Sequence, residues 1–438
     1  MHPIPTLLSP SFPISLLLLI SHLHPTSATV GVVNIDELLL SPEHPQFLSS
    51  SPPPKHNPHA PWSHKPHCKT SASLSSLNQK YCAFTSNTTG ANGLSIITTP
   101  SLAETAAPFF SEDPLSHFLT QDQAEYLYYN APPYEIVDHI PGKGKGVVAT
   151  RLIKKYETFM VDQATVVMDL ALEKSMGAPE NLELLRTAVQ RLRRPESVSG
   201  LSGKHNGAKD GEGKEEEAED VTGGFEEDIM MTNAFGTTVA GESFRGLFPL
   251  VSRINHACNP NAFVLFSQAG ISIAIKAYRD IQPGEEISIS YLLLGLPSAD
   301  RTEGLKRWGF TCTCALCTQG AAEKAASDAR RRAIAGAEPH IQALWKQGKL
   351  NGAIKLAEEI VQHMKDEAIM PMLTDQYANL ARMFLLQGDK QRADEYGELA
   401  LELLGDLGFL GTEWEGEWDL ERLLAVLGER GEGGMYAQ

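Results

Sequence analysis

Four of the six cysteines fall in two distant segments, and together they constrain the fold more than any other feature. Three of them form Cys-x-Cys-x-x-Cys within Cys312–Cys317, and the fourth is Cys258. Four thiolates are the ligand set that tetrahedral Zn²⁺ takes in structural sites. A metal bound by Cys258, Cys312, Cys314 and Cys317 would fold the later segment back onto the earlier one and contribute folding free energy, not catalysis. The alternative, four reduced and buried cysteines, is disfavoured by their spacing.

Cys258 belongs to a polar stretch, Arg253–Asn261, in which an amide, an imidazole and a thiol precede a proline flanked by amides. This composition predicts a tight, hydrogen-bonded turn. Further along, Gly284–Tyr291 reads as a glycine turn followed by an alternating strand that ends on a tyrosine. Adjacent strand residues point to opposite faces, so we expect Glu285 and Glu286 to be scaffold hydrogen-bonding groups, not an acid/base pair.

The order and spacing of these segments resemble the SET-domain protein-lysine methyltransferases. The match is to the SMYD-like branch, with its Asn-His-x-Cys-x-Pro-Asn core, its Gly-Glu-Glu strand ending in Tyr, and its Cys-x-Cys-x-x-Cys tail. The MYND zinc finger of animal SMYD proteins is missing, as in fingerless fungal SET-domain proteins. The resemblance implies an α+β fold: a mostly-β SET domain with a pseudoknot core, a Cys-rich post-SET zinc site, and an α-helical, TPR-like C-terminal domain.

The same resemblance implies a set of site residues. Tyr291 would be the catalytic residue, with its hydroxyl directed at the methyl group and the amine; the alternative is a strand-end tyrosine with a solvated hydroxyl. S-adenosyl-L-methionine would be the cofactor. The residues implied to bind it are Lys143, Gly144, Lys145, Asn233, Ser252, Asn255, His256 (largely through its backbone) and Phe310. Asn255 and His256 could instead serve only the structure of their own turn.

Glycines alternate with other residues through Gly142–Gly146, where close approach of the backbone to a ligand becomes possible. The Lys-Ser/Thr ending of a P-loop is absent, so this segment is not predicted to be one. Tyr156 stands where the family commonly has a turn glycine before Glu157.

After Cys317 the sequence becomes helical. Segments beginning at Gly348 and Gly388 share a Gly-turn-Ala pattern, with Ala353 and Ala393 in matching places. Their separation is a little longer than the ~34 residues of a tetratricopeptide repeat. A TPR-like domain is therefore expected, and a plain α-helical bundle is the alternative.

The expected organisation has five parts. They are a signal peptide or disordered leader at 1–30, a Pro/Ser/His-rich region at 31–90, the SET domain at 91–295 with a disordered acidic insertion at about 197–224, the post-SET zinc-binding segment at 296–320, and the TPR-like domain at 322–430.

The N-terminal apolar run and the downstream thiol cluster point to different cellular compartments. An apolar run, Phe12–Ile20, suits a signal peptide but has no Lys or Arg before it. A working signal would make Asn87 a glycosylation acceptor and allow Cys68 and Cys82 to pair. The downstream thiol cluster is instead typical of a reducing compartment. We expect the nucleus or cytoplasm, with the secretory pathway as the alternative.

The net charge of −17 argues against a broad nucleic-acid surface. A basic protein tail is an easier partner, although the acidity could serve solubility alone.

The expected function is S-adenosylmethionine-dependent protein-lysine N-methylation, with histones as a family expectation; the alternative is a catalytically weak SET/TPR-like interaction scaffold. The expected partners are a protein substrate with a target lysine, such as a histone tail, and a protein bound at the helical lobe. We expect no direct nucleic-acid contact, no membrane span and a monomer.

Overall fold

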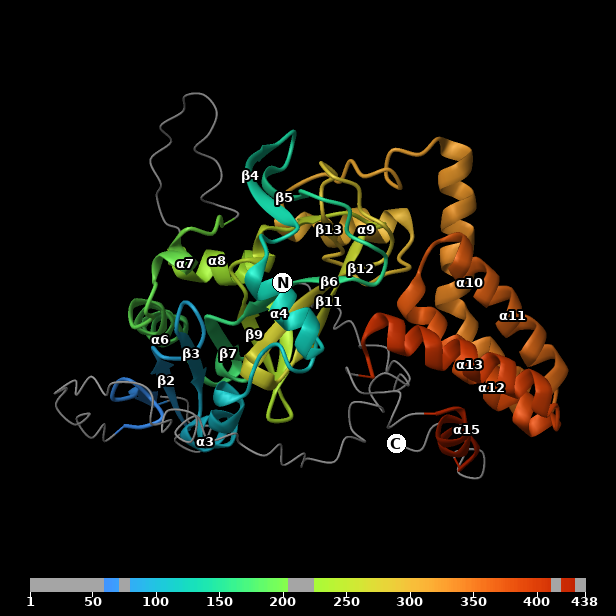
Figure 1. Ribbon diagram of the computed structural model, residues 1–438, viewed down its shortest axis with the longest axis horizontal. Coiled ribbons are helices and arrows are strands. Elements are labelled where there is room, and N and C mark those ends of the chain that lie inside the picture. The colour runs from blue at the N-terminus through green and yellow to red at the C-terminus, as the bar shows by residue number, and fades with distance from the viewer. Residues whose placement is uncertain (1–58, 71–78, 204–223, 411–418, 430–438) are drawn as a thin grey trace, which may run out of the picture.

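The structure is a computed structural model that describes residues 59–70, 79–203, 224–410 and 419–429 (Figure 1). The expected leader and most of the expected acidic insertion lie outside the described residues. Among the helices of the described part, none is both long enough and apolar enough to cross a membrane.

A six-stranded sheet forms one end of the molecule. Its strand order is β1 (His67–Thr70), β2 (Lys80–Ser86), β3 (Leu94–Thr98), β7 (Val166–Asp169), β9 (Glu242–Leu247) and β8 (Phe235–Val239). Neighbours are antiparallel except for the parallel pair β3–β7. Alternate residues of β2 serve the two faces: Ala83 packs toward helix α6 (Ala178–Gln190), and Phe84 packs on the opposite side with α3 (Pro100–Ala106). The sheet therefore begins at His67, within the region expected to be a Pro/Ser/His-rich segment.

The described residues also form three smaller β units. They are the sheet β11 (Ala262–Ser267), β12 (Ser272–Ala277) and β6 (Thr158–Gln163), the hairpin β4 (Tyr134–Ile140) with β5 (Gly144–Ala149), and the short parallel pair β10 (Asn255–His256) with β13 (Ser288–Ile289). Short helices connect the strands. These are α4 (Gln121–Tyr129), α5 (Leu172–Ser175), α7 (Glu196–Ser199), α8 (Phe225–Asn233) and α9 (Ser298–Leu305), with 3₁₀ turns η1 (Ala107–Ser111), η3 (Val251–Arg253), η4 (Ala269–Ile271) and η5 (Lys306–Trp308).

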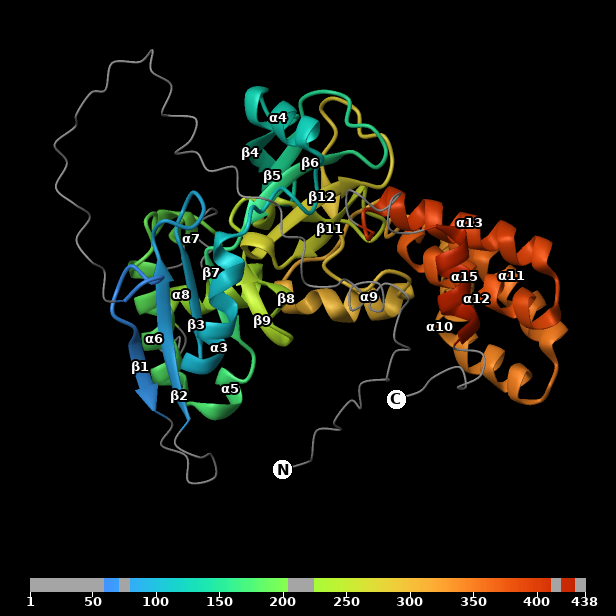
Figure 2. The same cartoon turned by 60° about the horizontal axis from the view of Figure 1, so that its bottom comes forward.

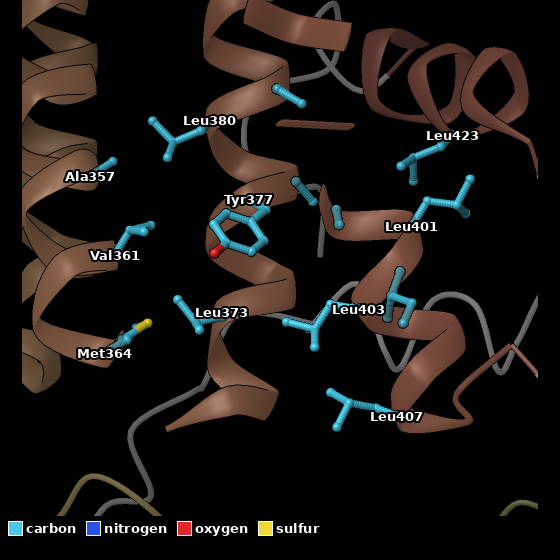
Figure 3. Packing of buried hydrophobic residues seen from close by; sticks show 14 of the residues in the cluster. Ala357, Val361, Met364, Leu373, Tyr377, Leu380, Leu401, Leu403, Leu407 and Leu423 are labelled. Carbon is cyan, nitrogen blue, oxygen red and sulfur yellow. The ribbon is translucent and has the colours of Figure 1, made fainter. Parts of the chain in front are cut away.

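In the part of the chain that the structure describes, five helices form the C-terminal region at the other end of the molecule (Figure 2). They are α10 (Ala321–Lys346), α11 (Leu350–Asp366), α12 (Met370–Gln387), α13 (Lys390–Leu407) and α15 (Leu420–Glu429). Figure 3 shows their shared core, in which Val361, Tyr377 and Leu403 come from three successive helices. Gly388 and Gly408 end α12 and α13 in the left-handed conformation, as expected of glycine caps. The expected α+β fold with a helical C-terminal region is confirmed.

One apolar core joins the helical region to the β part of the molecule. Phe263 and Leu265 of β11 belong to the same buried cluster as the C-terminal helices, and Tyr156 packs against it. Tyr156 has φ 65°, the left-handed region in which glycine is favoured. Tyr156 thus has the left-handed backbone of the glycine that the resembled family commonly has at this position. Its side chain packs where the helical region meets the β part of the molecule.

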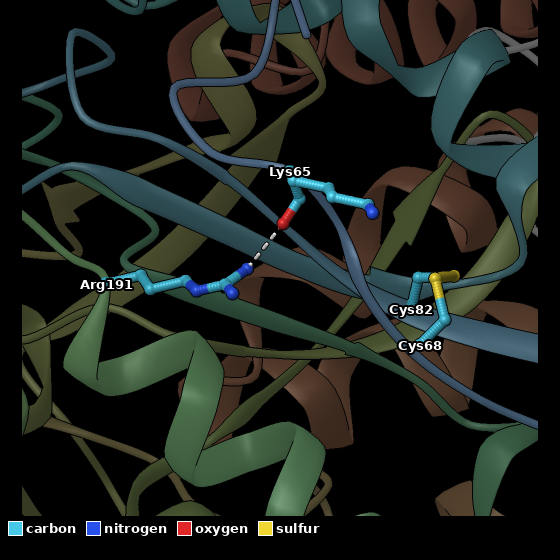
Figure 4. Close-up of a disulfide and its surroundings, with 4 residues drawn as sticks. All are labelled: Lys65, Cys68, Cys82 and Arg191. Carbon is cyan, nitrogen blue, oxygen red and sulfur yellow. Dashed lines mark hydrogen bonds between the residues drawn. A yellow bond between two sulfur atoms is a disulfide. The ribbon is translucent and has the colours of Figure 1, made fainter.

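Cys68 and Cys82 form a disulfide between β1 and β2, where they are directly paired residues (Figure 4). Nearby, the Arg191 guanidinium donates to the Lys65 carbonyl oxygen at 2.8 Å, and Lys69 pairs with Glu183 of α6 at 2.6 Å. The edge strand β1 is therefore fixed both to the sheet and to the helix that covers it.

Candidate functional site

The polar turn after η3 is held against the Gly284–Tyr291 segment by side-chain hydrogen bonds. β10 and β13 pair through Asn255 with Ser288 and His256 with Ile289. The amide of Asn261 donates to the Glu286 carbonyl oxygen at 2.8 Å and accepts from the Ser288 N–H at 2.8 Å. Two segments that the sequence analysis singled out separately are thus one structural unit.

Asp162 of β6 fixes the start of this unit. Its carboxylate accepts from the backbone N–H groups of Leu250 at 2.7 Å and Val251 at 3.0 Å. Burial raises the pKa of Asp162 to about 6, against the lowering effect of these hydrogen bonds. No local pattern indicates this role, because an Asp near the end of a strand is not distinctive.

The four cysteines expected to bind zinc lie together. Their sulfur atoms all lie within 4.8 Å of one another. Cys258 Sγ is 3.8 Å from Cys312 Sγ and 3.5 Å from Cys317 Sγ. Zn–S bonds of about 2.3 Å in a tetrahedron place sulfur atoms roughly 3.8 Å apart, so the donor set and its spacing fit a zinc ion.

The sulfur contacts also shift the proton affinities of the thiols. The hydrogen bond from Cys258 to Cys312 raises the pKa of Cys258 and lowers the pKa of Cys312. Hydrogen bonding to Cys258 lowers the pKa of Cys314 to about 5. The thiols therefore share protons unevenly, whereas a bound divalent cation would favour the thiolate at every position.

Tyr291 follows β13 and lies over the turn. Its hydroxyl donates to the Ile254 carbonyl oxygen at 2.8 Å. Burial, and then the negative charge of Glu286, raise the pKa of Tyr291. The phenol therefore stays protonated at neutral pH and can orient a ligand by hydrogen bonding, but it is a poor general base.

His256 is buried beside Tyr291 and the cysteines. Its Nδ1 accepts from the Tyr291 backbone N–H at 3.0 Å, and its Nε2 lies 3.2 Å from Cys258 Sγ. Its ring centroid is 5.3 Å from that of Tyr291 and 6.1 Å from that of Phe310. The ring thus lies between the candidate metal site and two aromatic residues, Tyr291 and Phe310.

The β4–β5 hairpin reaches this site through Asn255. The Asn255 amide donates to the Lys145 carbonyl oxygen at 3.0 Å and to Glu286 at 3.1 Å. Glu286 also pairs with Lys143 at 2.6 Å, while Glu285 pairs with Arg279 on another side. The two glutamates thus have separate partners, as the sequence analysis expected of scaffold groups, and Glu286 connects three segments of the site.

Gly144 begins β5 with φ 74°, a backbone conformation that side chains disfavour. A Cβ added at this position would meet no atom within 4 Å, so the backbone is open on that side. Gly144 therefore needs to be glycine for its conformation and not for lack of space.

Two aromatic residues of the expected post-SET segment, Trp308 and Phe310, lie beside Tyr291. The Trp308 indole N–H donates to the Thr232 carbonyl oxygen at 3.0 Å, and its ring centroid lies 5.3 Å from that of Tyr291. Phe310 is 37% exposed, so one part of its ring remains open to a ligand. Trp308 was missed by the sequence analysis, although its position two residues before Phe310 could have indicated it.

Asn233 and Ser252 lie together next to this segment. The Ser252 hydroxyl donates to the Asn233 carbonyl oxygen at 3.2 Å. The Asn233 amide donates to the carbonyl oxygens of Ser202 at 2.9 Å and Ile229 at 3.0 Å. The predicted site residues therefore form two adjoining groups, one around Asn255 and Tyr291 and one at the end of α8.

Residues 144–292 match the family model described as the SET domain. The chain thus carries a SET domain, and its further similarity is to SMYD proteins. The N-lysine methyltransferase SMYD2-B of Danio rerio is 37% identical over 102 residues, covering 22% of this chain and 23% of that protein. The histone-lysine N-methyltransferase SMYD3 of Homo sapiens is 31% identical over 128 residues, covering 29% and 26%. The N-lysine methyltransferase SMYD2 of Homo sapiens is 36% identical over 108 residues, covering 24% of each chain. The matches span about a quarter of these relatives.

Proposed function

We propose that this chain is an S-adenosylmethionine-dependent protein-lysine N-methyltransferase. The observation that carries the proposal is the convergence of Tyr291 and Phe310, from two later segments, on buried His256, which follows Asn255 in the chain. The similarity of the SET region to SMYD2 and SMYD3 supports the same reaction class.

When bound, S-adenosylmethionine would supply a methyl group on a positively charged sulfur. The lone pair of a neutral lysine amine would form the new N–C bond as the C–S bond breaks, S-adenosylhomocysteine would leave, and the methylated ammonium would lose a proton to solvent. The protein has to align the donor carbon with the amine nitrogen and keep that amine unprotonated. An aromatic surround favours the neutral amine by desolvation, and Tyr291 with Trp308 provides such surfaces. The Tyr291 hydroxyl, already directed at the Ile254 carbonyl, would help to orient the amine.

The residues proposed to hold the cofactor are those predicted from the sequence. Phe310 would pack on the adenine with its exposed part, and Asn255, now bonded to Lys145 and Glu286, would contact the cofactor through its amide. The remaining proposed contacts are Lys143, Gly144, Lys145, Asn233, Ser252 and His256.

We further propose that Cys258, Cys312, Cys314 and Cys317 hold a structural zinc ion. Its role would be to keep Phe310 and Trp308 next to Tyr291, because the post-SET segment has to return to the turn to supply its three thiols.

The proposed substrate is a protein with an accessible lysine, and a basic histone tail suits a chain of net charge −17. The nucleus or the cytoplasm is the proposed compartment, because free thiols of a zinc site persist under reducing conditions. The Cys68–Cys82 disulfide favours the secretory alternative. The Asn87 amide lies 3.1 Å from His64 Nε2 and is not fully exposed, an arrangement that does not favour glycosylation there.

The test is transfer of a labelled methyl group from S-adenosylmethionine to core histones or to a cell extract by the purified protein. The proposal expects a labelled band with the intact protein and none with Tyr291→Phe. Tyr291→Phe should still bind S-adenosylhomocysteine, because the ring remains. Binding of S-adenosylhomocysteine without labelling of any protein would contradict the proposed activity.

That contrary outcome would favour the alternative, a SET/TPR-like scaffold. A groove of about 520 Å³ lies between α10 and α11, with Ala337, Leu344 and Ile360 among its lining residues. It is the structural observation that favours a protein partner at the helical lobe.

A further inference from the structure

We infer that the His256 side chain is a positioning residue that couples the four-cysteine site to Tyr291. The inference goes beyond the backbone role implied by the family resemblance. Its first half, the effect on zinc binding, rests on the proposed zinc site, and its second half, the effect on methyl transfer, rests on the proposed methyltransferase activity.

The hydrogen bond from the Tyr291 backbone fixes the tautomer of His256. A backbone N–H can only donate, so the His256 Nδ1 that it contacts at 3.0 Å has to be the acceptor and carries no proton. In a neutral imidazole the proton then resides on Nε2. His256 is 3% exposed, so this ring orientation is enclosed by protein.

The protonated Nε2 faces a sulfur atom of the cysteine cluster. It lies 3.2 Å from Cys258 Sγ, well within the distance of an N–H···S hydrogen bond. A donor is most strongly bound by an ionised acceptor, so this bond is strongest when Cys258 is a thiolate. The thiolate form is also the form that binds a metal. The imidazole therefore supports the sulfur in its ligand state.

The two hydrogen bonds lie on opposite sides of one rigid ring. Any shift of Cys258 moves Nε2, and the planar ring transmits that shift to Nδ1 and to the backbone of Tyr291. The ring also lies beside Phe310, which adjoins the cysteine tail. The occupancy of the cysteine site is thereby linked to the position of the tyrosine hydroxyl.

Two amide substitutions separate the two hydrogen bonds. In His256→Asn the side-chain oxygen can occupy the place of Nδ1 and accept from the Tyr291 N–H, but nothing reaches Cys258. In His256→Gln the longer amide can occupy the place of Nε2 and donate to Cys258, but the Tyr291 N–H loses its acceptor. Both variants are neutral and polar, so each serves as the matched control of the other.

Zinc affinity is measured by competition with a chromophoric chelator, using the full chain under reducing conditions. We expect His256→Asn to bind zinc about 10- to 100-fold more weakly than His256→Gln, as is typical when a residue that hydrogen-bonds a metal ligand is replaced. With zinc at a concentration that saturates both variants, binding of S-adenosylhomocysteine and methyl transfer should show the reverse order, with His256→Gln the more impaired. Circular dichroism and thermal unfolding check that both variants fold.

Equal zinc affinities in the two folded variants would overturn the inference, because the bond to Cys258 would then be without effect. Equal losses of zinc and cofactor binding in both variants would also overturn it and would indicate a packing role. If neither variant nor the wild type transfers a methyl group, the proposed function fails while the zinc comparison still decides the role of His256.

Discussion

At the scale of single residues, two positions combine an unfavourable local state with a useful contact. Asp162 places a carboxylate beneath the backbone N–H groups of Leu250 and Val251, where burial raises its pKa to about 6. Tyr156 adopts a left-handed backbone while its side chain packs at the junction with the helices. Both costs are retained where the residue holds another segment in place: the start of the polar turn for Asp162, and the helical region for Tyr156.

Ionisation of Asp162 is expected to lower the stability of the protein. Because its folded pKa of about 6 exceeds the ordinary value of 3.8, the folded state binds the proton more tightly than the unfolded state. This contribution is present below pH 4 and is lost as the pH rises through 6, a change of about 3 kcal/mol.

Urea unfolding of the wild type and of Asp162→Asn between pH 4 and pH 7 measures this contribution. The variant should have the flatter dependence of the unfolding free energy on pH. Equal slopes for the two proteins would show that Asp162 titrates normally.

The left-handed strain at Tyr156 can be separated from its packing by two variants. Tyr156→Ala loses the side-chain contacts and keeps a Cβ at φ 65°, whereas Tyr156→Gly loses both. We expect the glycine variant to be more stable than the alanine variant by about 1 kcal/mol, because only glycine adopts this region without penalty. Chemical denaturation of the two proteins gives the difference, and an alanine variant of equal or greater stability would contradict the assignment.

At the scale of elements, the first helical hairpin is fixed by a buried ion pair. Glu367, just after α11, accepts from Arg331 and Arg330 of α10 at 2.7 Å each and from Ser327 at 2.7 Å. The Arg331 and Glu367 side chains are 2% and 3% exposed. Arg331 also donates to the Leu296 carbonyl oxygen, which ties α10 to the segment after the SET domain.

Glu367→Gln is expected to lower the unfolding free energy by about 3–5 kcal/mol, because Arg331 would remain buried without its counter-charge. Glu359→Gln, whose side chain is 62% exposed, is the matched control and should change stability by about 0.5 kcal/mol or less. Urea unfolding of both variants tests this, and equal effects would show that the buried pair contributes no more than a surface pair.

At the scale of the whole molecule, the cysteine cluster joins the post-SET segment to the turn, and one apolar core joins the β part to the helices. The Cys68–Cys82 disulfide joins the edge strand β1 to β2 of the six-stranded sheet. The cysteine cluster and the apolar core hold together segments that are distant in sequence.

Removal of the proposed zinc ion is expected to lower the melting temperature by about 10 °C, because the energy of metal binding is folding energy at such sites. The measurement is thermal unfolding with and without a chelator, under conditions that keep the Cys68–Cys82 disulfide intact. Cys314→Ser should reproduce the loss and no longer respond to the chelator. A melting temperature that the chelator leaves unchanged would contradict a structural metal.

The sequence by itself determined the elements with a local or chemical signature. The spacing of Cys312, Cys314 and Cys317 predicted the thiol cluster, and the glycine-marked helices predicted the helical C-terminal region, because ligand spacing and helix ends are local properties. The resemblance of the Asn-His-x-Cys and Gly-Glu-Glu segments indicated the residues around Tyr291.

Only the tertiary structure decided which groups meet across the chain. It placed β1 and β2 in the main sheet, paired Cys68 with Cys82, and brought Trp308 next to Tyr291. It also turned the His256 ring between Cys258 and the Tyr291 backbone. These contacts depend on strand pairing and side-chain orientation between remote segments, which no local pattern specifies because the burial that selects them exists only in the folded chain.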